Sequence, residues 1–542
     1  MEGAQFIKQI VEQSDYATTL DLEEAYHHIR VSDSLLPYFG FAFRGKTYSY
    51  RELPYGYKNS LYIFNKTLVI ALREIRRRFK IKISNYIDDI IILHKDKSIL
   101  KEVTLKVILF LQNLGWKLQK KKCRTNPSTV FTYLGWEWST QNMEVKMPRD
   151  RRHSMKSKLR EWINAAHNHQ IVKAKDLASL IGDLNFLRFQ FIEASLILNS
   201  LNRLLTQAVK KGGWNCSLQL NKRILGNLYS WLHKIIENNP VSILDQNPTA
   251  MMTTDAAEIG WGATLQSINL NLMDAGRWKG KWHLTDSNQR EMAAVLLALR
   301  SFQTDLINEE VQVLLLQTDN QTVEYSLRRW RATPALLHLV RTIYQLLTQL
   351  KIKLKTIHIP GLENKEADSL SRLAWRGDYR INPSALILTM NTLNFFPEID
   401  LFATRTNKQC QRYCSLLKDR HAIGKKGAFS INWSNQNLLI HPPIELIPRI
   451  LKKMKMEPST ALFLMPEWCK DKYRALFPTV INEMNLGPCN LVLEMGKSMT
   501  RLQLKLPPGN LTAVLLTSIQ LENNYTGIQL REQDSANYPS NN

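Results

Sequence analysis

The stretch IKISNYIDDIIIL, which runs from Ile81 to Leu93, places two adjacent carboxylates between two short apolar segments. Its first half alternates apolar and polar residues and Ile90–Leu93 is wholly apolar, so the pattern predicts a strand, a tight turn and a second strand. Asp88 and Asp89 at that turn would repel each other unless a positive partner lay beside them. A divalent metal ion is a natural partner, because hard cations bind carboxylate oxygens. Turns also favour Asp for local reasons, so both interpretations stay open for this stretch alone.

A second carboxylate lies nearer the start of the chain. Asp21 follows a short Thr-Thr-Leu segment that is typical of a strand, and it precedes a short amphipathic segment. Further motifs follow at intervals along the first 140 residues. In order, the five motifs are DLEEAY (21–26), LPYG (53–56), YIDD (86–89), LGWKLQKKKC (114–123) and FTYLGWEW (131–138).

This series of motifs resembles the palm of a reverse transcriptase, in the order expected for that family. The resemblance implies an α+β polymerase palm in which Asp21, Asp88 and Asp89 hold a pair of Mg²⁺ or Mn²⁺ ions. One ion would lower the pKa of the primer 3′-hydroxyl, and the other would neutralise the triphosphate. The expected partners are therefore an RNA template, a DNA primer and deoxynucleoside triphosphates.

The same resemblance implies four substrate-binding residues. Tyr26 lies where the family places an aromatic ring under the sugar of the incoming nucleotide, and such a ring would favour deoxynucleotides; a half-buried Tyr on a helix face is the simpler alternative. Gly56 allows close backbone approach. Lys58 is expected to face substrate or template. Lys122, or one of the two lysines before it, falls at the position of a lysine that donates a proton to pyrophosphate.

Charge and composition agree with a nucleic-acid partner. The chain has 542 residues, enough for two to four domains, and its 72 Lys and Arg outnumber its 48 Asp and Glu by 24. Only 20 residues precede Asp21. Since the family carries a basic fingers region there, we expect an N-terminally truncated chain, or a start codon inside a longer reading frame.

Six cysteines are too few for a disulfide scaffold and indicate a reducing compartment. Cys410, Cys414 and His421 suggest zinc, but no fourth ligand stands at a usual spacing. The chain has neither an apolar run of about 18 residues nor a signal peptide, so we expect an intracellular protein of the cytoplasm or nucleus, without a membrane segment. Nothing in the sequence specifies an oligomeric state.

Residues 146–245 have apolar residues at helical spacing, for example in KDLASLIGDLNFLRFQF. A helical region after a palm fits a thumb or connection that grips a duplex. A plain helical linker domain explains the same pattern.

A second group of acids occurs in residues 246–376. MMTTDAAEIGWGATL predicts two strands and AGRWKGKWHL a third; SNQREMAAVLLALRSF predicts a helix capped at Ser287 or Asn288; VQVLLLQTDN predicts a buried strand. A further helix, a strand and a last helix follow. The acids at the ends of these elements are Asp255, Glu291, Asp319 and Asp368.

This order of elements and acids is similar to ribonuclease H. The resemblance implies that the four acids hold two divalent ions about 3.5–4 Å apart, one activating water and the other stabilising the leaving 3′-oxygen of an RNA–DNA hybrid. His358 stands where retroviral-type members of that family place a histidine.

The last part, residues 383–517, carries DLFATRTN (400–407) and a later HPPI (441–444). A reverse transcriptase, a ribonuclease H and this block together resemble DIRS-type retrotransposon polyproteins, whose last module is similar to adenine methyltransferases. Here His441, Ile444 and Gly427 replace the residues expected around its active site, so we expect a degenerate module that does not use S-adenosylmethionine. Residues 518–542 are polar and predicted to be disordered.

The predicted fold class is therefore an α+β multidomain chain. Its parts are a palm (1–145), a helical thumb or connection (146–245), a ribonuclease H-like α/β domain (246–376), an α/β methyltransferase-like module (383–517) and a tail (518–542). The predicted function is RNA-directed DNA synthesis coupled to degradation of the RNA strand. Two alternatives remain: a catalytically impaired nucleic-acid-binding relic, and a ribonuclease H whose palm acts only as a clamp.

Overall fold

The computed structural model describes residues 3–278, 280, 282–373, 379–424, 426–501 and 504–519. The predicted tail lies outside these residues, apart from its first two positions. The chain divides into two compact units, Met1–Pro248 with Tyr325–Gln345 and Thr249–Glu324 with Leu346–Asn542. Within the described part of the chain, no helix combines the length and the apolar composition that crossing a bilayer requires.

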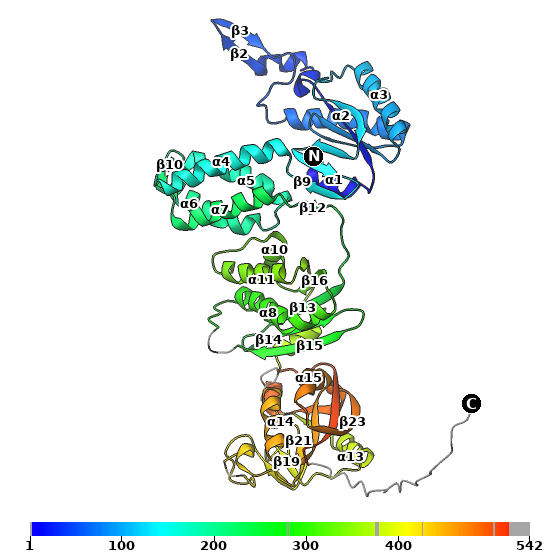
Figure 1. Cartoon of the computed structure of the whole chain (residues 1–542), viewed down its shortest axis with the longest axis vertical. Helices are drawn as coiled ribbons and strands as arrows, with labels where there is room; N and C mark the ends of the chain where they lie inside the picture. Colours follow the sequence, from blue (N-terminus) through cyan, green and yellow to red (C-terminus); the bar gives the residue numbers. More distant parts are fainter. Residues whose placement is uncertain are drawn as a thin grey trace, which may run out of the picture. The chain divides into compact units, whose positions relative to one another are not determined.

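The first half of unit 1 is built on an antiparallel sheet, with the helices α2 and α3 beside it (Figure 1). The predicted strand, turn and strand are present as β4 and β5, and the apolar run Ile90–Leu93 is completely buried. α2 buries Phe64, Leu68 and Leu72 at helical spacing and so covers the palm-like core. In spatial order the strands are β4 (Lys82–Tyr86), β5 (Asp89–His94), β1 (Tyr16–Asp21) and β6 (Arg124–Ser128); the helices are α1 (Ala4–Ile10), η1 (Ala25–His28), η2 (Asp33–Phe39), α2 (Ser60–Phe79) and α3 (Lys97–Asn113).

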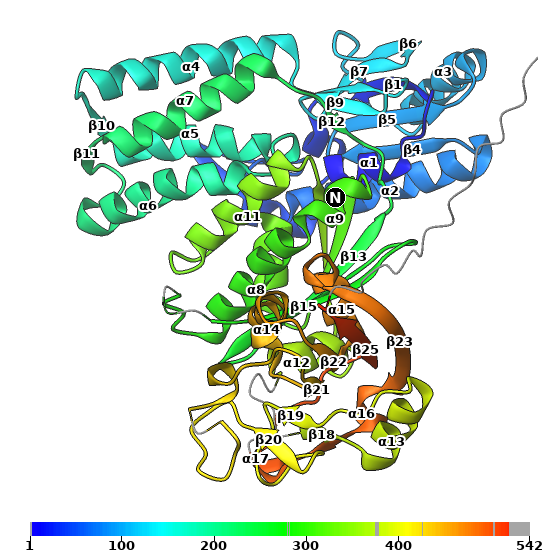
Figure 2. The same ribbon diagram turned by 60° about the horizontal axis from the view of Figure 1, so that its bottom comes forward.

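The second half of unit 1 is mostly helical, as predicted for residues 146–245. Four helices lie side by side in Figure 2, and their buried apolar residues form one core with a small second sheet. The helices are α4 (Arg149–His167), α5 (Ala174–Phe186), α6 (Ala194–Gly212) and α7 (Lys222–Glu237), with η3 (Leu187–Phe189); the strands are β7 (Val130–Tyr133), β8 (Trp136–Ser139), β9 (Glu144–Lys146), β10 (Ile171–Lys173), β11 (Ser217–Gln219) and β12 (Val241–Ser242). In the first half of the unit, β2 (Gly40–Phe43) and β3 (Lys46–Ser49) form a separate two-stranded sheet.

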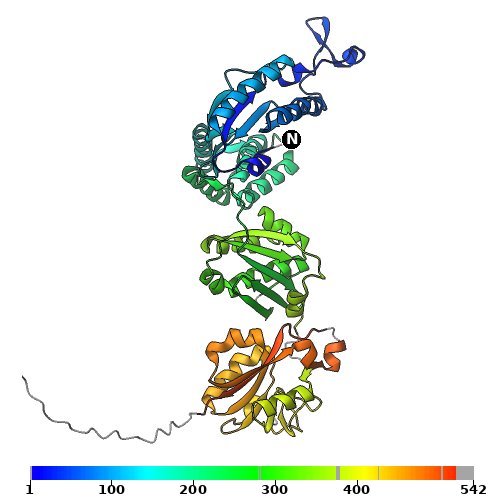
Figure 3. The same ribbon diagram turned by 90° about the vertical axis from the view of Figure 1, so that its right-hand side faces the viewer.

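Unit 2 begins with a five-stranded sheet of order β15-β14-β13-β16-β17, drawn in green in Figure 3. β13, β14 and β15 are antiparallel neighbours, whereas β16 and β17 run parallel to β13. The predicted order of strands and helices along the chain is present, with two further helices, α9 and α10, that were not predicted. The elements of unit 2 are β13 (Ala250–Ala256), β14 (Gly260–Gln266), β15 (Asn271–Arg277), α8 (Ser287–Ser301), α9 (Gln303–Asn308), β16 (Val313–Thr318), β17 (Lys353–His358) and α12 (Lys365–Ser371). Between β16 and β17 the chain forms α10 (Gln321–Arg329) and α11 (Leu337–Gln349), of which Tyr325–Gln345 belong to unit 1.

Two local predictions in this region were wrong. The third strand occupies 271–277 and not the predicted 275–284, because it pairs with β14 along its whole length from Gln266 back to Gly260. α8 is capped by Asp286 and not by Ser287 or Asn288, since the Asp286 carboxylate accepts a hydrogen bond from the Gln289 N–H at 2.8 Å.

The last part of unit 2, residues 379–519, is called the C-terminal module below. Its six-stranded sheet has the order β20-β19-β21-β22-β25-β23, in which the first four strands are parallel and the last two are antiparallel to their neighbours. The elements are β18 (Tyr379–Ile381), α13 (Pro383–Thr392), β19 (Ile399–Leu401), β20 (Arg412–Cys414), η4 (Ala428–Ser430), β21 (Asn437–Ile440), η5 (Ile444–Leu446), α14 (Ile447–Met456), β22 (Thr460–Pro466), α15 (Glu467–Tyr473), η6 (Arg474–Leu476), β23 (Thr479–Pro488), α16 (Cys489–Val492), β24 (Leu493–Met495), α17 (Lys497–Arg501) and β25 (Asn510–Thr517).

Candidate active sites

The three palm acids lie at one end of the β1–β5 pair. Asp21 and Asp89 face each other in the strand register, and the turn that holds Asp88 accepts a backbone hydrogen bond from Leu22 N at 3.1 Å. Burial raises the pKa of Asp89 to about 6, with the negative charges of Asp88 and Asp21 adding to the rise. Burial also raises the pKa of Asp21, against the opposing charge of Lys122. A cation placed among these groups would relieve the cost of ionising them.

The predicted lysine of this site is Lys122. Its Nζ lies 3.4 Å from Asp21 Oδ2. The chain is anchored there because Gln119 N donates to Asp21 O at 2.8 Å. Among the described residues, Lys122 is the one lysine of its run that forms an ion pair with a palm acid.

Tyr26 sits in η1 between two aromatic rings. Its ring centroid is 5.0 Å from that of Tyr55 and 5.7 Å from that of Phe64. Burial raises its pKa, and the charge of Asp88 adds to the rise, so the phenol lies close to the palm acids. The position of the Tyr26 ring is therefore compatible with both interpretations, a packing role and a contact to the sugar of the incoming nucleotide.

Gly56 and Lys58 lie on the exposed segment before α2. Gly56 has φ +88°, which is the left-handed region, and no atom of the chain lies within 4 Å of the place that a Cβ would occupy. The glycine is therefore required by the backbone conformation and not by a close approach within the chain.

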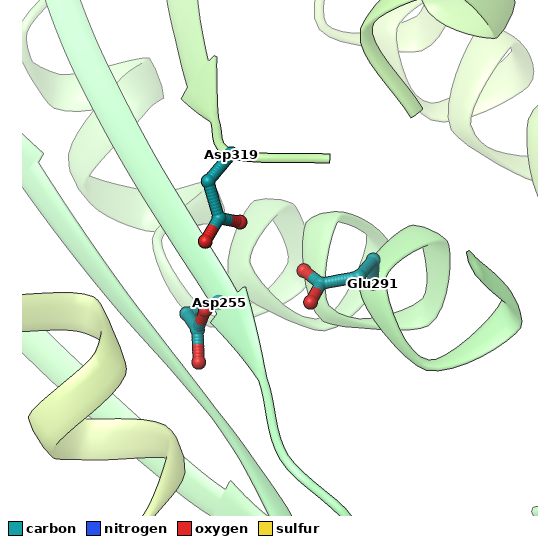
Figure 4. A group of neighbouring side chains, drawn as sticks. All are labelled: Asp255, Glu291 and Asp319. Carbon is teal, nitrogen blue, oxygen red and sulfur yellow. The ribbon is translucent and has the colours of Figure 1, made fainter. Parts of the chain in front are cut away.

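Three of the four acids predicted for residues 246–376 converge in unit 2. Asp255 comes from β13, Glu291 from the first turns of α8 and Asp319 from the residue after β16. One carboxylate oxygen of each lies within 4.8 Å of the other two, and Figure 4 shows the three side chains pointing toward one another. We call this group the three-carboxylate cluster. Among the described residues it is the one grouping of three His, Cys, Asp or Glu side chains at that spacing.

The electrostatics of the three-carboxylate cluster fit a bound cation. Burial, with added repulsion from Asp255 and Asp319, raises the pKa of Glu291 to about 9. Burial raises the pKa of Asp255 to about 6. Glu291 Oε2 is buried and accepts no hydrogen bond from any described residue. An unpartnered buried carboxylate oxygen facing two further carboxylates is the ligand set that Mg²⁺ or Mn²⁺ binds in proteins.

Asp368, the fourth predicted ligand, lies outside that group. It is on α12, where its Oδ1 accepts a hydrogen bond from Arg372 Nε at 2.6 Å. Its negative charge still contributes to the raised pKa of Asp255, so it lies near the cluster. Asp368 would have to release Arg372 to bind an ion shared with the other three acids.

Two positioning residues were not predicted from the sequence. Ser371 Oγ donates a short hydrogen bond to Asp255 Oδ2, and Asn364 Nδ2 donates to Asp255 Oδ1 at 3.4 Å. Both lie in residues 364–373, the segment that also carries Asp368, but the sequence does not show that this segment contacts Asp255 on β13. α12 lies so close to β14 that a Cβ on Gly262 would be 2.6 Å from Ser371 N.

His358 ends β17 beside the cluster. Its Nε2 is 3.0 Å from the backbone oxygen of Asp319, and the ring is exposed. The predicted histidine therefore lies next to a cluster acid.

The predicted motif residues of the C-terminal module lie in different surroundings. His441 Nε2 is buried without a hydrogen-bond partner among the described residues, and burial lowers its pKa to about 4. His441 lines a cavity of about 430 Å³ together with Asp400, whereas Ile444 is 2% exposed in the core of the module. Gly427 has φ +108°, and a Cβ there would lie 2.7 Å from Leu416 O.

The three candidate zinc ligands do not form a cluster among the described residues. Cys410 Sγ lies 3.6 Å from Pro397 O, Cys414 Sγ lies 3.9 Å from Gly424 O, and the exposed His421 ring is 3.1 Å from Arg420 Nε. All six cysteines are free thiols.

One family model matches the part of the chain that contains the palm acids. The family model described as "Reverse transcriptase (RNA-dependent DNA polymerase)" matches residues 3–138, which include all three palm acids. The chain carries a reverse transcriptase domain. This domain is of the type found in retroviral and retrotransposon Pol proteins, as the following relatives indicate.

Protein P of heron hepatitis B virus is 26% identical over 168 residues, covering 31% of this chain and 21% of that protein. The Pol polyprotein of transposon 297 from Drosophila melanogaster is 23% identical over 411 residues, 71% of this chain and 35% of the relative. The Tf2-3 polyprotein of Schizosaccharomyces pombe is 22% identical over 479 residues, which cover 81% of this chain and 34% of the relative. The chain thus spans about a third or less of these relatives.

Among solved structures, a foamy viral protease-reverse transcriptase in complex with double-stranded DNA is 17% identical, with a TM-score of 0.38 over 64% of this chain and 57% of that chain. The same protein in complex with an RNA/DNA hybrid gives 16% identity and a TM-score of 0.38, over 64% of this chain and 44% of the other.

Proposed function

We propose that this chain copies RNA into DNA with its reverse transcriptase domain and degrades the RNA strand of the resulting hybrid with the three-carboxylate cluster. The observation that carries the second activity is the convergence of Asp255, Glu291 and Asp319 on one point, with Glu291 Oε2 unpartnered. Ordinary surface acids do not gather in a buried position, where each raises the pKa of the next.

In the proposed nuclease, the cluster acids and Asp368 hold the divalent ions. Such ions, when bound, supply an activated water and neutralise charge that develops on the leaving oxygen. Ser371 and Asn364 fix the orientation of the Asp255 carboxylate. His358 contacts the backbone oxygen of Asp319, and its exposed ring is suited to exchange protons with water.

In the proposed polymerase, Asp21, Asp88 and Asp89 hold the ions and Tyr26 selects the sugar. Lys122 neutralises Asp21 until an ion binds, and is then free to interact with the triphosphate. Lys58 and the backbone at Gly56 lie exposed on the segment that precedes α2 and would contact template or substrate.

For the rest of the chain we propose a DIRS-type retrotransposon origin, with a methyltransferase-like module that transfers no methyl group. Ile444 is buried in the core and offers no ring to stack on a base. His441 holds an unpartnered nitrogen where an oxygen acceptor for an amino group would be required.

A second candidate function is a nuclease whose palm serves only as a clamp. Two observations favour it. The carboxylate oxygens of the three palm acids do not all lie within 4.8 Å of one another, as those of the cluster acids do. In addition, Asp21 forms an ion pair with Lys122.

The test is Asp319→Asn, assayed for cleavage of an RNA–DNA hybrid in Mg²⁺. Loss of one ligand charge should abolish cleavage at little cost to folding, while the exposed Glu258→Gln on the neighbouring turn serves as the matched control. Cleavage by Asp319→Asn at the parent rate would refute the nuclease assignment. Primer extension by the same preparations decides between the two candidate functions.

A further inference from the structure

The C-terminal module and the five-stranded sheet of unit 2 share one hydrophobic core. Ala275 on β15 and Leu370 and Leu373 at the end of α12 pack into the same buried cluster as the strands of the module. A parallel β-bridge joins Leu373 to Lys505, and Lys472 forms an ion pair with Asp274. The segment 504–509 is therefore held beside α12 by packing and backbone contacts.

Between α12 and this segment runs a groove of about 820 Å³. One wall is α12, with Lys365, Asp368 and Arg372 along it. The opposite wall belongs to the C-terminal module and includes Lys505 and Thr500. Asp368 of α12 lines the groove, and Ser371 of the same helix donates a hydrogen bond to Asp255. α12 therefore links the wall of the groove to the three-carboxylate cluster.

The groove is lined by three cations, Lys365, Arg372 and Lys505, and by two acids, Glu366 and Asp368. Lys365 and Lys505 are exposed on opposite walls, and no ion pair is found for either among the described residues. Arg372 pairs with Asp368, and it would become available to a ligand if Asp368 served as a metal ligand. Unpaired lysines beside hydroxyl and amide donors are the usual ligands of backbone phosphates.

We propose that the C-terminal module forms one wall of the nucleic-acid groove of the nuclease, and that Lys505 binds a backbone phosphate of the hybrid next to the scissile position. This inference rests on the proposed nuclease function. A nucleic acid is favoured over an acidic peptide because one wall of the groove is the helix that carries Asp368 and the Asp255 contact Ser371. The module thereby contributes to substrate binding without any chemistry of its own.

The experiment measures equilibrium binding of a fluorescein-labelled RNA–DNA hybrid to the full chain in Ca²⁺, at several salt concentrations, and cleavage in Mg²⁺. A lost phosphate contact reduces the slope of log K against log salt by about 0.9, which is about eight-fold in affinity at 0.1 M salt. Lys505→Ala should show this loss. Its backbone bridge to Leu373 is retained by Ala, so the fold is preserved, and an unchanged melting temperature checks this.

The control is Lys452→Ala, which removes an exposed lysine of α14 in the same module but outside the groove. It should bind with the parent affinity and slope. Parent-like binding and slope for Lys505→Ala, in a preparation that still cleaves the hybrid, would overturn this inference and leave the nuclease standing. A parent chain that neither binds nor cleaves the hybrid would instead overturn the nuclease, and the groove with it.

Discussion

Replacing Glu291 by Gln should stabilise the metal-free protein at neutral pH while it abolishes RNA cleavage. Gln has the shape of the protonated acid and stays neutral at every pH. The Glu291 carboxyl is 6% exposed, its Oε2 has no partner, and burial raises its pKa to about 9 from an ordinary 4.5. The parent must therefore keep a proton on this group, or ionise it at a cost, whenever it is folded without metal.

The magnitude follows from linkage. Because the pKa of Glu291 is raised in the folded state, its contribution to the free energy of unfolding is most favourable below about pH 4.5. This contribution is lost progressively as the pH rises toward 9. pH 7 is roughly 2.5 units above the ordinary pKa of the group, and each unit costs about 1.4 kcal/mol, so the parent is about 3.5 kcal/mol less stable than at pH 4.5 through this group. Gln carries no such cost.

The assay is urea unfolding in EDTA at pH 5 and pH 7, on the parent, Glu291→Gln and the exposed control Glu258→Gln. The stability difference between Glu291→Gln and the parent should grow by roughly 2–3 kcal/mol from pH 5 to pH 7, while the control follows the parent. Addition of Mg²⁺ should stabilise the parent and leave Glu291→Gln unchanged. A difference that does not vary with pH would show that Glu291 ionises freely, and would refute the picture of a buried, proton-holding ligand.

Three further predictions concern the other sites. Asp89→Asn should reduce primer extension on an RNA template at least about 100-fold, since the charge of a metal ligand is lost, and should leave hybrid cleavage at the parent rate; equal loss of both activities in parallel assays would refute separate sites. Tyr26→Ala should raise the incorporation of ribonucleotides relative to deoxynucleotides several-fold in single-nucleotide extension, and an unchanged ratio would reduce Tyr26 to a packing residue. The full chain incubated with labelled S-adenosylmethionine and duplex DNA should transfer no label, and methylated adenine above the background of a protein-free reaction would contradict the assignment made from His441 and Ile444.

Much of the fold could be predicted because its signals are local. The strand–turn–strand around Asp88 and Asp89 follows from alternation and an apolar run, and the helices of residues 146–245 follow from helical spacing. The partners of the site acids could not be predicted in this way. Ser371 and Asn364 contact Asp255 across 116 and 109 residues of sequence. The hydrogen bond from Arg372 to Asp368 depends on the conformations of two side chains four residues apart. That spacing allows the contact but does not require it.

The exact start of a helix or strand was harder to predict than its existence. Asp286, Ser287 and Asn288 are three consecutive residues that all favour a helix cap, and the choice among them depends on which side chain reaches an unpaired N–H. The third strand of unit 2 begins earlier than its aromatic residues indicate, because pairing with β14 determines its extent.

The common core of the C-terminal module and α12 has a consequence for how such a chain changes over generations. Cutting the gene after Leu373 would expose Ala275 of β15, Leu370 of α12 and Leu373 just beyond α12 to water. Leu370 lies on the helix of Asp368 and next to Ser371, whose hydroxyl contacts Asp255. For the nuclease proposed above, selection would therefore preserve the module's interior while its motif residues are free to drift, and the module would persist as a structural part of its neighbour.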